Sequence, residues 1–132
     1  LVQRFSLEDS VVITGRMSDM ELSKMYERAD VFVLTPVSEG LSFEGFGLVY
    51  LDANSRGIPV IGMYGSGAEE AVKDGYNGLI AQADDTQDLQ NKILSILEPS
   101  LYRNLSINSI KWANQMSWGN RVGQYIDLYK AK

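Results

Sequence analysis

The chain has 132 residues, which is the length of one domain with a single core. Its 12 Lys and Arg against 17 Asp and Glu give a net charge of -5 without a basic cluster, so we expect neither nucleic acid nor an anionic membrane surface as a partner. Cysteine and histidine are absent, which excludes disulfides, thiol nucleophiles, imidazole bases and the usual zinc sites within this chain.

The N-terminus begins at Leu1 with neither an initiator methionine nor a signal-peptide pattern, so we expect a piece of a longer protein. No apolar run approaches the roughly 18 residues of a membrane span, so no transmembrane segment is expected.

In the first 35 residues, apolar β-branched runs predict strands at residues 11–14 and 31–35, with a helix at residues 18–29 between them. Ser18 and Glu21 form the capping box that starts this helix.

The middle of the chain continues the alternation of helix and strand. A helix is predicted at residues 46–56, because Gly57 and Pro59 follow as stop signals. A strand at residues 59–62, a short helix at about residues 68–73 and a strand at residues 78–81 come next.

After the last strand, apolar residues at helical spacing predict three helices, at residues 86–97, 101–115 and 118–130. Pro99 ends the first of them. We expect four aromatic side chains of these helices to pack in the core or between helices: Trp112, Trp118, Tyr125 and Tyr129.

Strands that alternate with helices across short glycine-bearing loops predict an α/β fold. We expect residues 1–132 to form a single domain with a Rossmann-like parallel sheet of about four strands, helices on both faces and C-terminal helices. In such sheets ligands bind beyond the carboxyl ends of the strands. A functional site is therefore expected at the loops that follow residues 14, 35 and 62.

The segment from Thr35 to Ala53 carries the strongest functional signal. A glycine-flanked turn leads from a strand into a helix, and the free amides at that helix start are a site for a diphosphate. Glu44 precedes the helix and Asp52 follows eight positions later, so both carboxylates can accept hydrogen bonds from the hydroxyls of one sugar or ribose. Acidic residues also favour helix starts for electrostatic reasons alone, which is the alternative explanation.

This segment resembles the donor-binding signature of retaining GT-B-type glycosyltransferases, the glycosyl transferases group 1, in which two Glu separated by seven residues flank a Gly-Phe-Gly turn. The resemblance continues through residues 53–62, 66–72 and 74–80, and upstream through residues 12–19, so it covers nearly the whole chain in order. It implies the C-terminal, nucleotide-sugar-binding domain of such an enzyme, without its first βα units.

The resemblance also implies roles for single residues. Glu44 would be the catalytic-site residue that contacts the transferred sugar, and Asp52 would bind the ribose hydroxyls. The donor sugar and its diphosphate would be held by backbone amides of the turn, which comprises Gly45, Phe46, Gly47 and Leu48. The nucleotide base would lie against the turn that carries Gly15, Met17 and Asp19. Glu70 stands where the family has the acid of a Gly-Gly-x-Pro-Glu motif, although helix-start electrostatics explain it as well.

The sequence departs from the family in three respects. Asp52 is one methylene shorter than the family's Glu. The first βα units, which bear an Arg and a Lys that hold the diphosphate, are absent, and so is the acceptor-binding N-terminal domain. We therefore expect the isolated chain to be inactive.

The function that this implies is the donor-binding portion of a hexosyltransferase-like glycosyltransferase of glycan biosynthesis, which transfers a sugar from a nucleoside diphosphate sugar to a hydroxyl acceptor with retention. No cofactor and no metal would be required beyond the donor substrate. The parent would be cytoplasmic, or work at the inner face of the membrane. Two alternatives remain open: a nucleotide-sugar epimerase fragment, and a non-catalytic α/β interaction module.

The resemblance further implies the strand order 3-2-1-4-5-6, with residues 11–14 as the third strand and 31–35 as the fourth. Without the first two strands, residues 31–35 would have an unpaired edge. We expect residues 11–14 to pair directly with residues 31–35, and a homodimer that completes the sheet is the second alternative.

Overall fold

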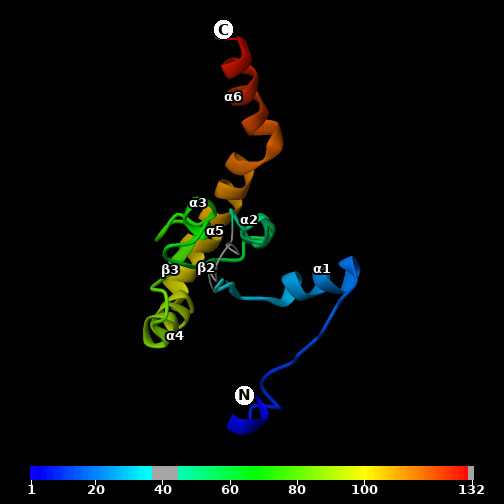
Figure 1. Ribbon diagram of the computed structural model, residues 1–132, viewed down its shortest axis with the longest axis vertical. Helices are drawn as coiled ribbons and strands as arrows, with labels where there is room; N and C mark the ends of the chain where they lie inside the picture. The colour runs from blue at the N-terminus through cyan, green and yellow to red at the C-terminus, as the bar shows by residue number, and fades with distance from the viewer. Residues whose placement is uncertain (37–44, 131–132) are drawn as a thin grey trace.

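The computed structural model describes residues 1–36 and 45–130, which form an α/β fold with all six predicted helices (Figure 1). The elements in chain order are the 3-10 helix η1 (Gln3–Phe5), α1 (Asp19–Arg28), β1 (Phe32–Val33), α2 (Leu48–Ser55), β2 (Val60–Met63), α3 (Ala68–Ala71), β3 (Gly78–Ala81), α4 (Thr86–Ile96), α5 (Pro99–Met116) and α6 (Trp118–Lys130).

The three strands form one parallel sheet in the order β1-β2-β3. Phe32 pairs with Val60, and Val60 pairs in turn with Gly78. This order agrees with the last three positions of the strand order expected above. The carboxyl ends of all three strands therefore lie at one edge of the sheet.

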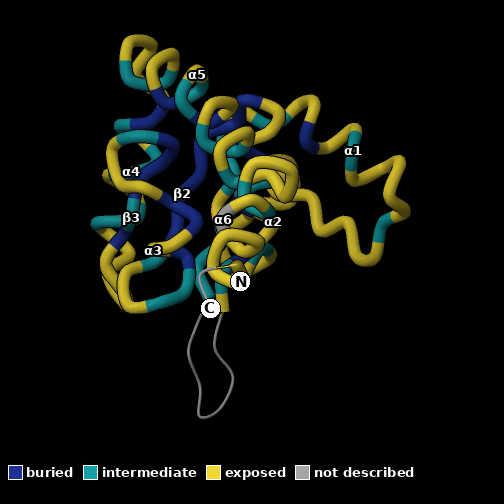
Figure 2. The backbone as a smooth tube through the Cα atoms, turned by 90° about the horizontal axis from the view of Figure 1, so that it is seen from above, coloured by how far each residue is buried: buried dark blue, intermediate teal, exposed yellow. Residues whose placement is uncertain are grey.

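The predicted strand at residues 11–14 is wrong. Val12 and Ile13 are 83% and 81% exposed, and the segment has no regular structure. It belongs to the N-terminal segment that carries α1 and reaches away from the sheet, so it does not pair with residues 31–35 (Figures 1 and 2). An extended segment becomes a strand only when a neighbour completes its hydrogen bonds, and the described residues provide no such neighbour here.

Two hydrophobic clusters cover the two faces of the sheet, because successive side chains of a strand point to opposite sides. Val60 belongs to the cluster that α2 and α3 cover, together with Tyr50 and Ala68. Ile61 belongs to the cluster that α4 and α5 cover. Figure 2 shows the buried residues gathered around β2, whereas most of the N-terminal segment is exposed.

Helix α1 is joined to this body by its last turn. Its N-terminus has the predicted capping box, in which Ser18 and Glu21 bond each other's backbone N–H groups. Near its C-terminus, Tyr26 is buried and its ring lies 6.0 Å from that of Phe32. The rest of α1 is largely exposed, so the contacts of Tyr26 near its C-terminus join the helix to the body.

In the part of the chain that the structure describes, no helix combines the length and the apolar character needed to cross a bilayer.

Candidate functional site

The start of α2 has the geometry of an anion site. Gly47 is the N-cap residue and adopts the left-handed conformation, with φ 73° and ψ 63°, which favours glycine at this position. The backbone N–H groups of Leu48 and Val49 have no acceptor within the helix because these are its first two residues. Leu48 and Val49 are exposed, so the amides and the positive end of the helix dipole can act on a ligand here.

Asp52 lies one turn further along α2, with an exposed side chain. Its carboxylate accepts no hydrogen bond from any residue that the structure describes. Its neighbours are Tyr26 and Arg56: the guanidinium of Arg56 lies 4.8 Å from the centre of the Tyr26 ring and donates to the backbone oxygen of Asp52. Burial, with a smaller contribution from the charge of Asp52, raises the pKa of Tyr26. This face of α2 therefore offers a free carboxylate beside a neutral phenol.

The other face of α2 borders a cavity of about 310 Å³ that we call the aromatic cleft. Helices α2, α3 and α6 and the end of α5 contribute to it. Its lining residues are Phe46, Leu48, Leu51, Glu70, Met116, Trp118, Arg121 and Tyr125. Because Phe46 and Leu48 also belong to the start of α2, the cleft and the anion site are continuous.

The turn predicted to contact the base lies elsewhere. Gly15 has φ 63°, and Met17 lines a cavity of about 400 Å³ with Thr14, Lys24 and other residues of the N-terminal segment. Asp19 is exposed in the first turn of α1. This cavity shares no residue with the aromatic cleft. The structure therefore does not bring the Gly15 turn and the start of α2 to one cavity.

The loops after β1, β2 and β3 line a third cavity, of about 320 Å³, that includes Pro36, Met63, Tyr64 and Asp84. Of the three loops expected to form one site, the two that follow residues 35 and 62 meet here. The loop after residue 14 does not, because it lies on the N-terminal segment.

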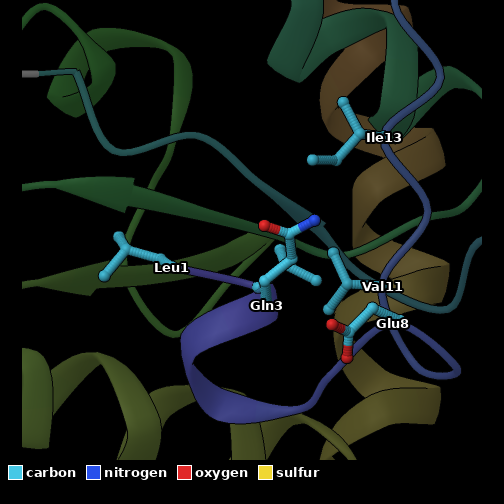
Figure 3. Close-up of a pocket in the computed structure, with 6 residues that line it drawn as sticks. Leu1, Gln3, Glu8, Val11 and Ile13 are labelled. Carbon is cyan, nitrogen blue, oxygen red and sulfur yellow. The ribbon is translucent and has the colours of Figure 1, made fainter.

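A fourth cavity, of about 580 Å³, lies within the first 13 residues. Figure 3 shows Leu1, Val11 and Ile13 around it, with Gln3 and Glu8 as its polar groups. Its lining is mainly apolar and comes from the N-terminal segment alone, so it is not part of the site at α2.

The predicted site residues thus fall into three groups according to where they lie. Phe46, Gly47, Leu48 and Asp52 lie together on α2 or at its start, with the exposed Gly45 just before them. The turn with Gly15, Met17 and Asp19 lies apart from them. Glu44 falls outside the described residues, so its predicted role stays a prediction. Within the described ranges, no three Asp or Glu side chains are grouped so that they could hold a metal ion.

The aromatic residues correct one expectation and reveal the residues that the sequence reasoning missed. Trp112 packs inside, where its indole N–H donates to the backbone oxygen of Ala71 at 2.8 Å. The expectation for Trp118, Tyr125 and Tyr129 was packing in the core or between helices; they are 73%, 54% and 84% exposed, so none of them packs in the core. Helical spacing shows which side chains share a face, but it carries no signal that the face is left uncovered.

A family model described as "Glycosyl transferases group 1" matches residues 1–112 of the chain. Among curated proteins, the chain is 32% identical over 98% of its length to O-antigen chain mannosyltransferase B of Escherichia coli. It is 28% identical over 94% of its length to a GDP-mannose-dependent phosphatidylinositol monomannoside mannosyltransferase of Mycolicibacterium smegmatis. The chain spans only 32% and 34% of the lengths of these two relatives.

Solved structures of glycosyltransferases also resemble the chain. Sucrose-phosphate synthase from Thermosynechococcus elongatus matches with a TM-score of 0.79 and 31% identity, over 99% of this chain and 33% of that one. HepE from Anabaena, solved in complex with UDP-glucose, matches with a TM-score of 0.78 and 25% identity, over 98% of this chain and 34% of its own. The C-terminal domain of a group 1 glycosyl transferase from Francisella tularensis shares the fold, with a TM-score of 0.73 at 21% identity.

Proposed function

Because the chain belongs to the glycosyl transferases group 1, we propose that it is the donor-binding part of an enzyme that transfers a sugar from a nucleoside diphosphate sugar to a hydroxyl group. The whole enzyme would be about three times as long as this chain, since the chain spans 32% of its E. coli relative. Its remaining part would bind the acceptor. The parent would act in the cytoplasm, or at the inner face of the membrane.

The observation that carries this proposal is the start of α2. Left-handed Gly47 delivers the chain into the helix with the amides of Leu48 and Val49 free, and such a helix start stabilises a phosphate through hydrogen bonds and its dipole. The exposed carboxylate of Asp52 on the same helix suits a ribose, because carboxylates accept strong hydrogen bonds from hydroxyls. The free amides and the Asp52 carboxylate lie about one helical turn apart, so one ligand that joins a diphosphate to a ribose can contact both.

The reaction would proceed with retention at the anomeric carbon. The bond from that carbon to the leaving phosphate oxygen breaks, and a bond from the acceptor oxygen forms on the same face. The proton of the acceptor hydroxyl passes to the departing diphosphate. The amides of Leu48 and Val49 would stabilise the charge that develops on the diphosphate, and the fold would hold the donor in the orientation for attack.

The remaining site residues keep the roles that the family resemblance implies. Glu44 would contact hydroxyls of the transferred sugar, and the turn of Gly15, Met17 and Asp19 would contact the base. For that turn to reach a nucleotide on α2, the N-terminal segment must move relative to the position described here, in which Met17 lines a separate cavity. The part of the parent enzyme that precedes this chain would pack against the N-terminal segment and hold its turn beside the nucleotide.

Glu44→Gln in the parent enzyme tests the proposal. We expect turnover to fall with folding intact, because the variant removes a charge-assisted hydrogen bond worth about 1.5–3 kcal/mol. Glu98→Gln is the matched control, since Glu98 is exposed before α5 and does not line the cleft at the start of α2, and its turnover should equal that of the wild type.

Three outcomes would contradict the proposal or one of its parts. Unchanged turnover in Glu44→Gln would remove the role of Glu44, and conversion of the donor sugar without acceptor would indicate an epimerase. The isolated chain should transfer no measurable sugar, because holding two substrates in register needs both halves of the cleft. Transfer by the purified chain would contradict the division of roles between the two parts.

A further inference from the structure

Tyr50 joins the start of α2 to the end of β1. It is the third residue of α2, and its side chain is fully buried. Its phenol O–H donates to the backbone oxygen of Leu34, the residue that follows β1, at 2.8 Å. Its backbone N–H donates to the oxygen of Gly47 at 3.0 Å, which closes the first turn of the helix. One residue therefore belongs to the turn that starts α2 and also binds the neighbouring strand end.

The acceptor of this hydrogen bond is itself held by the sheet. The backbone N–H of Leu34 donates to the oxygen of Ile61 at 3.2 Å, which continues the pairing of β1 with β2. The position of the Leu34 carbonyl is therefore set by the register of the sheet. The bond from Tyr50 fixes the start of α2 relative to that register.

The ring of Tyr50 is held by packing as well. It meets the ring of Phe32 in β1 edge to face, with centres 5.8 Å apart and 89° between the planes, a favourable arrangement of two aromatic rings. Both rings pack in the cluster that α2 and α3 cover. Side chains in a close-packed core keep one rotamer, and a buried hydroxyl without a partner is costly. The phenol is therefore held in place to donate to Leu34.

The two free amides of the anion site come directly before Tyr50. Leu48 and Val49 are the first two residues of α2, so the directions of their N–H groups follow the orientation of its first turn. A hydrogen bond weakens steeply as its angle departs from linear, and donors fixed in advance cost no reorganisation when a ligand binds. A contact that fixes this turn therefore affects the strength with which the amides bind an anion, although the buried Tyr50 side chain does not touch the ligand.

We propose that Tyr50 is a positioning residue of the donor site: its hydrogen bond to Leu34 holds the start of α2 against β1 and so aims the amides of Leu48 and Val49 at the diphosphate. The identity of the ligand rests on the proposed function. The positioning itself rests on the buried contacts of Tyr50. Because these contacts act on the first turn of α2, Tyr50 affects the binding of the diphosphate and leaves the binding of the nucleoside unchanged.

Tyr50→Phe tests this role, because it keeps the aromatic ring and removes the hydroxyl. In the parent enzyme we expect the dissociation constants of pyrophosphate and of the better of UDP and GDP to rise about three- to tenfold. The corresponding nucleoside, uridine or guanosine, should bind as it does to the wild type. Ligand-observed NMR measures these constants, and circular dichroism verifies that the variant is folded.

Tyr102→Phe is the matched control. Tyr102 is a half-buried residue of α5 that packs in the cluster on the opposite face of the sheet, so its variant should leave all these affinities unchanged. A role of Tyr50 in stability alone would change the affinities for nucleoside and diphosphate by the same factor. Equal factors in Tyr50→Phe, or affinities for UDP, GDP and pyrophosphate that equal those of the wild type, would overturn the positioning role.

Pyrophosphate separates this role from the proposed function. If the wild type binds UDP or GDP and Tyr50→Phe binds it equally well, the positioning role fails while the proposed function stands. If the wild type binds neither nucleotide, the proposed function fails, and pyrophosphate alone decides the role of Tyr50: weaker binding in Tyr50→Phe supports it. A wild type that binds no pyrophosphate and neither nucleotide overturns both.

Discussion

Asn77 and Asn54 are joined side chain to side chain in the interior: the Nδ2 of Asn77 donates to the Oδ1 of Asn54 at 2.5 Å. Both residues are fully buried. Asn54 in turn donates to the hydroxyl of Ser109 at 3.1 Å, so the network ties α2 to α5 and to the turn before β3. Among the described residues no buried side-chain polar atom lacks a partner. The helix that carries the proposed donor site is thus fixed by a fully satisfied polar network.

Asn54→Ala should destabilise the chain by about 2–4 kcal/mol, because it removes the buried hydrogen bonds that the Asn54 amide makes with Asn77, with Ser109 and with the backbone oxygen of Ile58. Urea unfolding followed by circular dichroism measures the change. Asn104→Ala is the control, since Asn104 is exposed on α5, and it should change the free energy of unfolding by less than about 0.5 kcal/mol. Equal losses in the two variants would contradict the importance of the network.

Gly78→Ala should break the pairing of β2 and β3. A Cβ at Gly78 would overlap the backbone oxygen of Val60 and lie 2.7 Å from its Cγ2, so the strands must separate. We expect a loss of about 3 kcal/mol in the same unfolding measurement. Gly123→Ala on α6, where a Cβ meets no atom within 4 Å, should be neutral or slightly stabilising. Tolerance of Gly78→Ala would contradict the register described for the sheet.

The N-terminus of α1 should loosen in acid. The backbone N–H and hydroxyl of Ser18 donate to the Glu21 carboxylate at 2.8 and 2.7 Å, and these bonds lower the pKa of Glu21. Because the folded pKa lies below the unfolded value, the cap is fully stabilising above the unfolded pKa, about 4.3, and is lost as the pH falls through the folded one. Carbon chemical shifts of residues 19–22 measure the helix content.

Glu21→Gln keeps a capping side chain that does not titrate, so its α1 should change less with pH than that of the wild type. Glu21→Ala should be frayed at neutral pH already. If the Gln variant lost helix content in acid as the wild type does, another group would be responsible.

Asp52→Glu should strengthen nucleotide binding, because it restores the side-chain length found in the family at the proposed ribose contact. We expect the dissociation constant of the better of UDP and GDP to fall severalfold in calorimetry of the parent enzyme, and to rise in Asp52→Ala. The corresponding 2′,3′-dideoxynucleoside diphosphate is the control ligand, since it lacks the hydroxyls. If its affinity changed in parallel, Asp52 would not act on the ribose.

The parts of the fold that sequence patterns predicted correctly are those with local causes. The strand at residues 78–81 and the helix start at Ser18 coincide with the structure, since a short apolar run and a capping box act within a few residues. The α/β class follows from the alternation of such segments. A glycine-flanked turn before α2 was also predicted, but the predicted helix began at residue 46, whereas in the structure it begins at Leu48 after the left-handed Gly47.

Three features depended on tertiary structure, because each is decided by a partner distant in the sequence. Residues 11–14 have strand-forming composition, yet they stay irregular since no neighbouring strand is described beside them. Asn54 is buried among polar groups up to 55 residues away, which helical periodicity cannot indicate. Trp118 is a large apolar residue of the kind usually found in a core, but whether it is buried depends on which other part of the protein packs against α6. Local energies select helix, strand or turn, whereas burial and pairing are properties of the contacts between elements.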